Sequence, residues 1–162
     1  MLTGIILAGG KSSRMGQDKS LINSNVSRLA NELRLAGCSR VVVMCGTIDR
    51  MALFDEECVI DSKDSLAESL YDFISELSGQ IQLASCDAYL ADADLFSKID
   101  GVPTDDLGNR QPLLAKIGSD SPLRKSVKIS EMFQDIQSCD GGMKARNTNT
   151  PEELKEILSR LN

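Results

Sequence analysis

The chain has 162 residues, of which 41% are hydrophobic and 26% charged, and its formal net charge is −6. This length and composition are typical of one globular domain, so we expect residues 1–162 to form a single domain with its own core. The acidic balance argues against binding to nucleic acid or to an anionic membrane, because phosphate groups repel such a chain. The acidic net charge does not argue against a small phosphorylated ligand, which could bind where basic residues cluster.

The cysteines and the start of the chain favour a cytoplasmic location. The five cysteines have no Cys-x-x-Cys spacing and the chain has no histidine, which excludes a zinc site of His and Cys ligands. We expect reduced thiols in a reducing compartment, most of them in the core. Residues 1–10 are apolar but short and lack a basic leader, so we expect neither a signal peptide nor a membrane span there.

Short apolar runs alternate with helix-like segments in the first hundred residues. Strands are predicted at residues 3–8, 40–45, 57–60 and 80–85, where apolar and β-branched residues are consecutive. Helices are predicted at residues 27–36, 65–77 and 91–99, where apolar residues have helical spacing. Ser65, followed three residues later by Glu68, predicts a capping box at the start of the second of these helices.

The remaining residues have a weaker pattern. Residues 100–109 are rich in Gly, Pro and Asp and are expected to form a loop. Residues 111–117 are expected to form a strand or an irregular edge segment, and residues 124–136 a loose helix that ends at Gly141-Gly142. Thr150-Pro151 predicts the start of a last helix.

The alternation of strands and helices predicts an α/β fold with a mostly parallel sheet. In such sheets, ligands bind beyond the carboxyl ends of the strands. This rule places three distant features on one edge of the sheet: the glycines that follow residue 8, Asp61 after the third strand, and Asp87 after the fourth.

The loop LAGGKSSRMGQDK, residues 7–19, has the parts of a phosphate site. It matches neither a Walker loop nor a dinucleotide fingerprint. Gly9 and Gly10 allow the backbone to approach a ligand closely, Arg14 can grip phosphate oxygens, and Lys19 can stabilise charge on a leaving pyrophosphate. From these residues alone, a solvated turn with incidental charges is an equally good interpretation.

The same string resembles the signature of the small-molecule nucleotidyltransferases, and its ending resembles the molybdenum cofactor guanylyltransferases, the molybdopterin-guanine dinucleotide biosynthesis protein A family. VIDS at 59–62, SCD at 85–87 and NTNTPEEL at 147–154 resemble later family segments in the same order. The resemblance implies a three-layer Rossmann-like fold of the nucleotide-diphospho-sugar-transferase type. It also implies GTP and Mg²⁺, transfer of GMP to molybdopterin with release of pyrophosphate, and transient protein partners that handle the cofactor.

The resemblance also implies roles for individual residues. The catalytic set is Lys19, Arg14 and Asp87, with Asp87 as the magnesium ligand. The nucleotide-binding set is Leu7, Ala8, Gly9, Gly10, Lys19, Asp61 and Asp87. Asn147 and Asn149 would complete the metal shell or contact the acceptor, although these asparagines fit equally well as shapers of the turn before Pro151. Asp61 has a loop-capping role as its alternative. A phosphate nucleophile is already ionised, which suits a chain without histidine.

This chain departs from the family pattern around the base and the acceptor. Residues 65–69 replace a Gly-Pro-Leu-Ala-Gly stretch, Ala88-Tyr89 follows Asp87 in place of Met-Pro or Thr-Pro, Met44 replaces an asparagine, and Gln111-Pro112 replaces a histidine-proline pair. A Gly-Lys-Pro segment is missing, so residues 21–27 are expected to form a shortened connection. The alternatives are therefore CTP with molybdopterin, GTP with adenosylcobinamide phosphate, or a catalytically silent nucleotide-binding protein.

Overall fold

The computed structural model describes residues 1–8, 19–147, 152, 155–156 and 159, and the side chains of these residues apart from 19–23. Its centre is a five-stranded sheet. The strand order across the sheet is β3 (Glu57–Ile60), β2 (Arg40–Gly46), β1 (Leu2–Leu7), β4 (Gln80–Ser85) and β6 (Lys116–Ile117). The first four strands are parallel and β6 is antiparallel to β4, so the mostly parallel sheet predicted from the sequence is confirmed.

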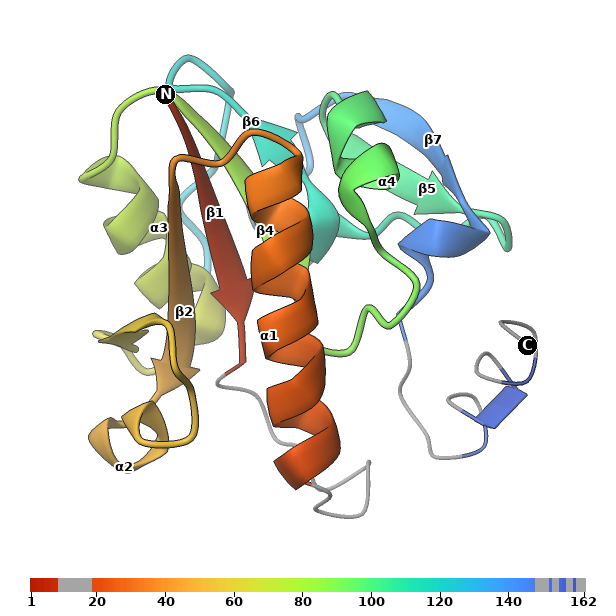
Figure 1. Ribbon diagram of the computed structural model, residues 1–162. Coiled ribbons are helices and arrows are strands. Elements are labelled where there is room, and N and C mark those ends of the chain that lie inside the picture. Colours follow the sequence, from red (N-terminus) through yellow and green to blue (C-terminus); the bar gives the residue numbers. More distant parts are fainter. Residues whose placement is uncertain (9–18, 148–151, 153–154, 157–158, 160–162) are drawn as a thin grey trace.

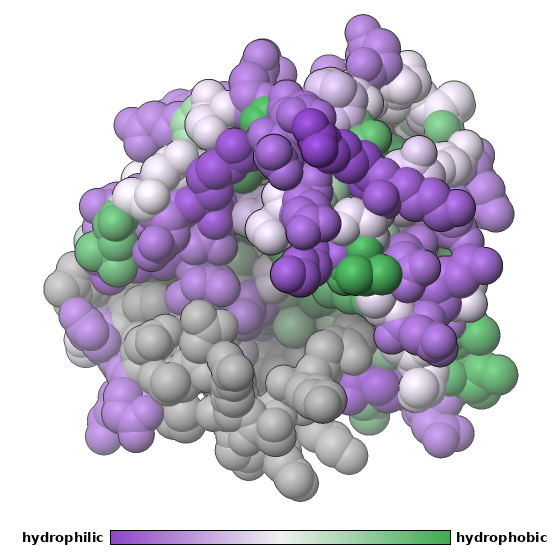
Figure 2. Space-filling model, turned by 180° about the vertical axis from the view of Figure 1, so that it is seen from behind, coloured by the Kyte–Doolittle hydropathy of each residue, from purple (hydrophilic) through white to green (hydrophobic). Residues whose placement is uncertain are grey.

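Helices cover both faces of this sheet (Figure 1). Helix α1 (Lys19–Leu35) and helix α4 (Ala93–Lys98) pack on one face, and helix α3 (Leu66–Ser75) packs on the other. The result is the expected three-layer α/β architecture. On the face seen from behind, hydrophilic side chains predominate and hydrophobic ones form small separate spots (Figure 2).

Alternation along the strands separates the core into two layers. Ile6, Val43 and Ala84 pack toward α1, whereas their neighbours Ile5 and Leu83 pack toward α3. This follows from the pleat of a β-strand, which directs successive side chains to opposite faces. Because both faces are covered, the strands are apolar along almost their whole length, which explains why they could be located from the sequence.

The parallel strands lie where they were predicted, but α1 is longer than expected. It begins at Lys19 and not at Ser27, so the predicted shortened connection at residues 21–27 is wrong. The stretch 19–26 is rich in Ser and Asn, which masks its helical state in a search for apolar periodicity. Ser65 is confirmed as the N-cap of α3, because the Glu68 amide donates to Ser65 Oγ at 3.1 Å. The Glu68 side chain accepts from the Ser65 hydroxyl at 2.9 Å.

A second sheet lies beside the first, next to α4 (Figure 1). It pairs β5 (Val102–Asp105) with β7 (Ser138–Gly142) in parallel. The predicted loop at residues 100–109 is therefore wrong, because its central part is a strand whose partner lies more than thirty residues later. Gly141-Gly142 belongs to β7 and does not end a helix. Local sequence pattern carries no signal of such distant pairing.

The rest of the chain consists of short elements. These are α2 (Ile48–Met51), the 3₁₀ helix η2 (Pro112–Leu114), α5 (Ile129–Met132) and the 3₁₀ helix η3 (Met143–Ala145). The long helix predicted at residues 124–136 is wrong, since only α5 within it is helical. Residues 111–117 form η2 followed by β6 at the sheet edge, as the edge-segment alternative predicted. The predicted start of a last helix at Thr150-Pro151 lies outside the described residues.

All five cysteines are free thiols, with Cys38 and Cys45 buried and the other three half-buried. Within the described part of the chain, no helix has the length and apolarity that a membrane crossing requires.

Candidate nucleotide-binding site

The carboxyl ends of β1 and β4 meet at the lower edge of the sheet in Figure 1. Leu7 is in register with Ser85, and just beyond the strands the Cys86 amide donates to the Leu7 carbonyl at 3.1 Å. The chain runs from β1 outward through β2 and β3, then returns to place β4 on the other side of β1. A crevice for a ligand opens where the strand order reverses in this way. It lies where the glycine-rich segment leaves β1.

The first predicted carboxylate, Asp61, follows β3 at this edge. Its amide donates to the Gly46 carbonyl at 3.0 Å, which fixes the backbone beside the end of β2. Its Oδ1 atom is buried and has no hydrogen-bond partner among the described residues. Burial raises the pKa of Asp61, and a hydrogen bond with the Gly46 backbone opposes that rise. A buried, unsatisfied carboxylate oxygen is costly, and a bound ligand with hydroxyl or amine donors would satisfy it.

The second predicted carboxylate, Asp87, follows β4. The Ser85 hydroxyl donates to Asp87 Oδ1, and both residues line a cavity of about 320 Å³. Asn147 lines the same cavity although it lies sixty residues farther along the chain. The complete lining is Ser85, Asp87, Ala88, Gln111, Pro112, Leu113, Leu114, Ile129 and Asn147. The cavity thus combines polar groups beside the strand end with an apolar wall.

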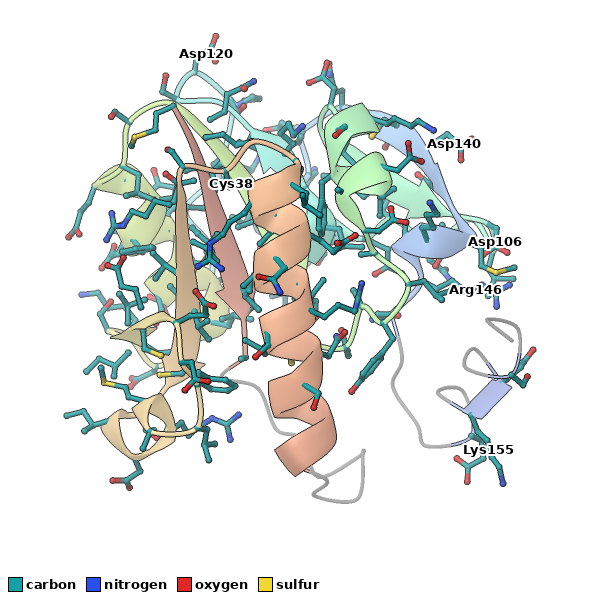
Figure 3. The ribbon with its side chains drawn as sticks, viewed as in Figure 1. Cys38, Asp106, Asp120, Asp140, Arg146 and Lys155 are labelled. Carbon is teal, nitrogen blue, oxygen red and sulfur yellow. The ribbon has the colours of Figure 1, made fainter. Side chains whose placement is uncertain are left out.

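An ion pair explains how Asn147 reaches this cavity. The preceding residue, Arg146, grips Asp106 through two hydrogen bonds, from Nε to Oδ1 at 2.6 Å and from Nη2 to Oδ2 at 2.7 Å. Figure 3 shows the two labelled side chains next to each other at the side of the molecule that carries β5 and β7. Since Asp106 directly follows β5, the pair fixes the segment that leads to Asn147 against the second sheet.

Sequence analysis missed Arg50, which lies at the same edge of the sheet. It belongs to the short helix α2, and its guanidinium donates to the Cys45 carbonyl at 2.8 Å and to the Ala8 carbonyl at 2.6 Å. Arg50 therefore bridges the carboxyl ends of β2 and β1 and brings a positive charge to Ala8. A single arginine in a four-residue helix has no periodic or motif signal by which it could have been found.

The positions that depart from the family pattern have local structural roles here. Met44 is buried in the core. Ser65 caps α3, and the Ser69 hydroxyl accepts from the Lys63 amide at 2.9 Å and donates to its carbonyl. Gln111 Nε2 donates to Asp105 Oδ2 at 2.9 Å.

The structure brings Leu7, Ala8, Asp61 and Asp87 to one edge of the sheet, and it places Asn147 in the cavity beside Asp87. Four other predicted site residues lie outside the described residues: Gly9, Gly10, Arg14 and Asn149. The backbone of Lys19 begins α1, but its side chain is outside the description.

The donors around Asp87 suit a hard cation. The cavity holds a carboxylate, a hydroxyl and an amide, from Asp87, Ser85 and Asn147. Magnesium prefers such oxygen ligands and usually takes only one or two carboxylates, with water and phosphate oxygens completing its shell. Among the described residues, no three Cys, Asp or Glu side chains form a cluster that could hold a metal by themselves. The residues present therefore fit a magnesium ion that arrives with a phosphate ligand.

The known structures that share this fold include a nucleotidyltransferase. A nucleotidyl transferase from Methanothermobacter is 17% identical and superposes with a TM-score of 0.67, covering 100% of this chain and 99% of its own. The Aq1419 protein of Aquifex aeolicus is 16% identical with a TM-score of 0.67, over 91% of this chain and 93% of its own. A 4-diphosphocytidyl-2C-methyl-D-erythritol synthase from Anaerococcus prevotii is 13% identical with a TM-score of 0.61, covering 99% of this chain and 98% of its own.

A search of curated proteins finds no match. A family model does match the chain, over residues 4–100, which include β1 from Gly4 onward, the glycine-rich segment and both carboxylates. The chain belongs to the family of the MobA-like NTP transferase domain, whose chemistry is nucleotidyl transfer.

Proposed function

We propose that this protein transfers GMP from GTP to molybdopterin, with release of pyrophosphate and with Mg²⁺ as the metal. The observation that supports the proposal most strongly is the junction of β1 and β4. The hydrogen bond from the Cys86 amide to the Leu7 carbonyl joins the start of the glycine-rich segment to the residue before Asp87. A triphosphate bound by the segment 7–19 would therefore extend past Asp87.

The nucleotide would lie along the ends of β1, β2 and β3. The backbone at Leu7, Ala8, Gly9 and Gly10 would surround the base and ribose, since glycine permits close approach. Asp61 would accept hydrogen bonds from the nucleotide through its unsatisfied Oδ1. Arg50 holds one of these residues, Ala8, through its carbonyl and connects it to Cys45 near the end of β2.

The triphosphate would extend from there toward Lys19 and Arg14. Both side chains would stabilise negative charge on the phosphates, and Lys19 would stabilise the charge that develops on the leaving pyrophosphate. Asp87 would hold Mg²⁺, with Ser85, Asn147 and Asn149 as oxygen donors around it. The metal would supply charge neutralisation at the phosphates.

The acceptor would lie in the cavity beside Asp87. Its terminal phosphate is ionised at neutral pH, so attack on the α-phosphorus needs no protein base. Gln111 and Asn147 offer polar contacts there, and Leu113 and Ile129 offer an apolar wall. Catalysis would then consist of alignment and charge stabilisation.

A different base or acceptor is the alternative that specific observations favour. Ser65 and Ser69 occupy the glycine-rich stretch of the family and both are hydrogen-bonded within the local turn. One structure with the same fold is a synthase whose product carries a cytidyl group. The candidates are CTP with molybdopterin and GTP with adenosylcobinamide phosphate.

The proposal is tested by measuring pyrophosphate release with GTP, CTP and ATP, each offered molybdopterin or adenosylcobinamide phosphate in the presence of Mg²⁺. We expect release with GTP and molybdopterin only. Release with CTP or with the cobinamide would transfer the assignment to the corresponding alternative. Tight nucleotide binding with no release from any pair would identify a silent nucleotide-binding protein.

Lys19→Ala tests the loop assignment. We expect the variant to lose on the order of 10³-fold in kcat/KM for GTP without loss of folding. Arg34→Ala is the matched control, because Arg34 is on the same helix but pairs with Glu56 at the surface. Unchanged turnover in Lys19→Ala would remove Lys19 from the site.

A further inference from the structure

One face of α1 is polar although it packs against protein. Asn25 is only 3% exposed, and Arg28 and Glu32 on the same face are half-buried. The spacing of three and four residues places the three side chains in one row along the helix. We call this row, Asn25, Arg28 and Glu32, the α1 polar row.

The α1 polar row bonds to the backbone around Asp87. Asn25 Nδ2 donates to the Cys86 carbonyl at 2.7 Å. Arg28 donates to the Ala88 carbonyl through Nη2 at 3.0 Å and to the Ala91 carbonyl through Nη1 at 2.6 Å. The carbonyls on both sides of Asp87 are thus held by one helix.

Arg28 and Asn25 also brace each other. Arg28 Nε donates to Asn25 Oδ1 at 2.9 Å, which fixes the orientation of the amide so that its NH₂ group points to Cys86. Burial lowers the pKa of Arg28, and the carboxylates of Glu32 and Asp92 oppose that effect. The planar guanidinium of Arg28 makes three directed hydrogen bonds in a partly desolvated setting. A lysine at this position would not reproduce these three bonds.

The segment that these bonds hold has little structure of its own. Apart from the bonds to α1, two backbone hydrogen bonds shape the start of this segment: the Cys86 amide donates to the Leu7 carbonyl at 3.1 Å, and the Ala88 amide donates to the Ser85 carbonyl at 3.0 Å. Glu32 Oε1 accepts from the Ala93 amide at 3.1 Å and continues the attachment to the start of α4. The path of the chain through Asp87 is thus set jointly by the end of β1 and by side chains of α1.

We infer that Asn25 and Arg28 are positioning residues that hold Asp87 at its place beside the triphosphate, an inference that rests on the function proposed above. Helix α1 begins at Lys19, and Arg28 lies nine residues later, about two and a half turns along the same rigid helix. The residue assigned to the triphosphate and those that hold the metal ligand therefore belong to one element. Arg28 sets the distance between them without touching substrate.

The test compares Arg28→Met and Arg28→Lys with two controls on α1. Arg34→Met removes a surface arginine of the same helix, and Val26→Ala removes buried volume next to Asn25 without touching the α1 polar row. GTP affinity is measured by calorimetry with Mg²⁺ and with EDTA, and backbone hydrogen exchange is measured over residues 86–91.

We expect Arg28→Met to reduce the gain in GTP affinity that Mg²⁺ provides by about tenfold, as is usual when a residue that supports a metal ligand is lost. Affinity in EDTA should stay within about twofold of wild type, and exchange over residues 86–91 should become faster. Arg28→Lys should recover part of the gain. In an Asp87→Asn background, Arg28→Met should cause no further change in the gain in GTP affinity that Mg²⁺ provides, because the two residues act as one unit.

A folded Arg28→Met variant with the same gain from Mg²⁺ as Val26→Ala would overturn the inference, as would equal exchange over residues 86–91. If Arg28→Met does not fold, the inference is decided by Arg28→Lys, through its gain in GTP affinity from Mg²⁺ and its hydrogen exchange over residues 86–91. A wild-type protein that binds no GTP would overturn the proposed function, and the exchange measurement would then still decide whether Arg28 holds the segment of Asp87.

Discussion

The chain divides into two regions that are built differently. Residues 2–100 contain the four parallel strands of the central sheet and α1, which is 17 residues long. Residues 101–147 contain elements of two to five residues. In the first region, backbone ladders and apolar runs set the strands, and polar side chains such as Arg28 and Arg50 bond to carbonyls around their ends. In the second, the elements are short and polar side chains such as Asp105 and Arg110 join them, and the family model covers none of it.

Asp105 illustrates the second mode of construction. It is 6% exposed and accepts hydrogen bonds from the amides of Leu107 and Asn109 and from Gln111 Nε2. Arg110 likewise donates to the carbonyls of two residues that follow α5, Phe133 and Ile136. The strands on the nucleotide side of the proposed site therefore follow from local sequence pattern, whereas the elements on its acceptor side are joined by long-range polar contacts.

The largest expected effect concerns Asp87, the residue of the first region that we propose as the metal ligand. Asp87→Asn should lower Mg²⁺-dependent pyrophosphate release by on the order of 10³-fold, because a neutral amide binds the metal weakly. Circular dichroism should show an unchanged fold. Asp94→Asn, on the exposed side of α4, is the control and should keep full activity. An unchanged metal requirement in Asp87→Asn would remove that residue from the site.

The second effect tests whether the two regions unfold together. Phe133 is 1% exposed and belongs to the same buried cluster as residues of β4 and β6, so Phe133→Ala should lower the free energy of unfolding by about 3–5 kcal/mol. Denaturant unfolding should show one transition in both proteins, as expected of a single domain. Two separate transitions would mean that residues 101–147 unfold on their own. Val127→Ala at the surface should change little.

The third effect concerns the polar contacts of the second region. Although burial opposes ionisation, hydrogen bonds from Asn109, Gln111 and Leu107 hold the pKa of Asp105 below its ordinary value. Asp105→Asn should therefore cost about 1–3 kcal/mol at neutral pH. The difference from wild type should shrink as the pH falls through the folded pKa, where the carboxylate is protonated.

The same variant separates the two halves of the site. Since Asp105 orients Gln111 in the cavity, Asp105→Asn should raise KM for the acceptor and leave KM for GTP unchanged. An equal rise in both KM values would contradict the division between the two regions. Asp120→Asn is the control, because Asp120 lies at the opposite edge of the sheet (Figure 3).

The smallest expected effect on stability is that of Asp61→Asn, which should stabilise the protein, whereas Phe133→Ala and Asp105→Asn should destabilise it. Burial raises the pKa of Asp61, so its ionised form destabilises the folded state at neutral pH, and this cost disappears as the pH falls below the ordinary pKa. Asp61→Asn should therefore raise the melting temperature at neutral pH, with a difference that vanishes at acid pH, while it weakens GTP binding. Asp64→Asn, an exposed neighbour, should do neither. A lower melting temperature in Asp61→Asn would contradict the cost assigned to this carboxylate.

The sequence sufficed for much of the fold and for part of the site. Strands β1 to β4 were located by consecutive apolar residues, and the rule for parallel sheets then brought Asp61 and Asp87 to one edge. Strands β5 and β7 were missed because their pairing joins residues that are far apart in the chain. Arg50 and Arg28 were missed for a related reason: an arginine that bonds to distant carbonyls has the same local sequence as one exposed to solvent.

The edges of the central sheet affect how the protein behaves at high concentration. One edge strand, β3, has four residues, and the other, β6, has two. Glu57, at the start of β3, is exposed and is paired with Arg40 on β2 through a hydrogen bond of 2.6 Å. A strand from another molecule would gain few ladder bonds at either edge and would have to approach this ion pair. Short, charged edges of this kind protect a sheet against edge-to-edge aggregation.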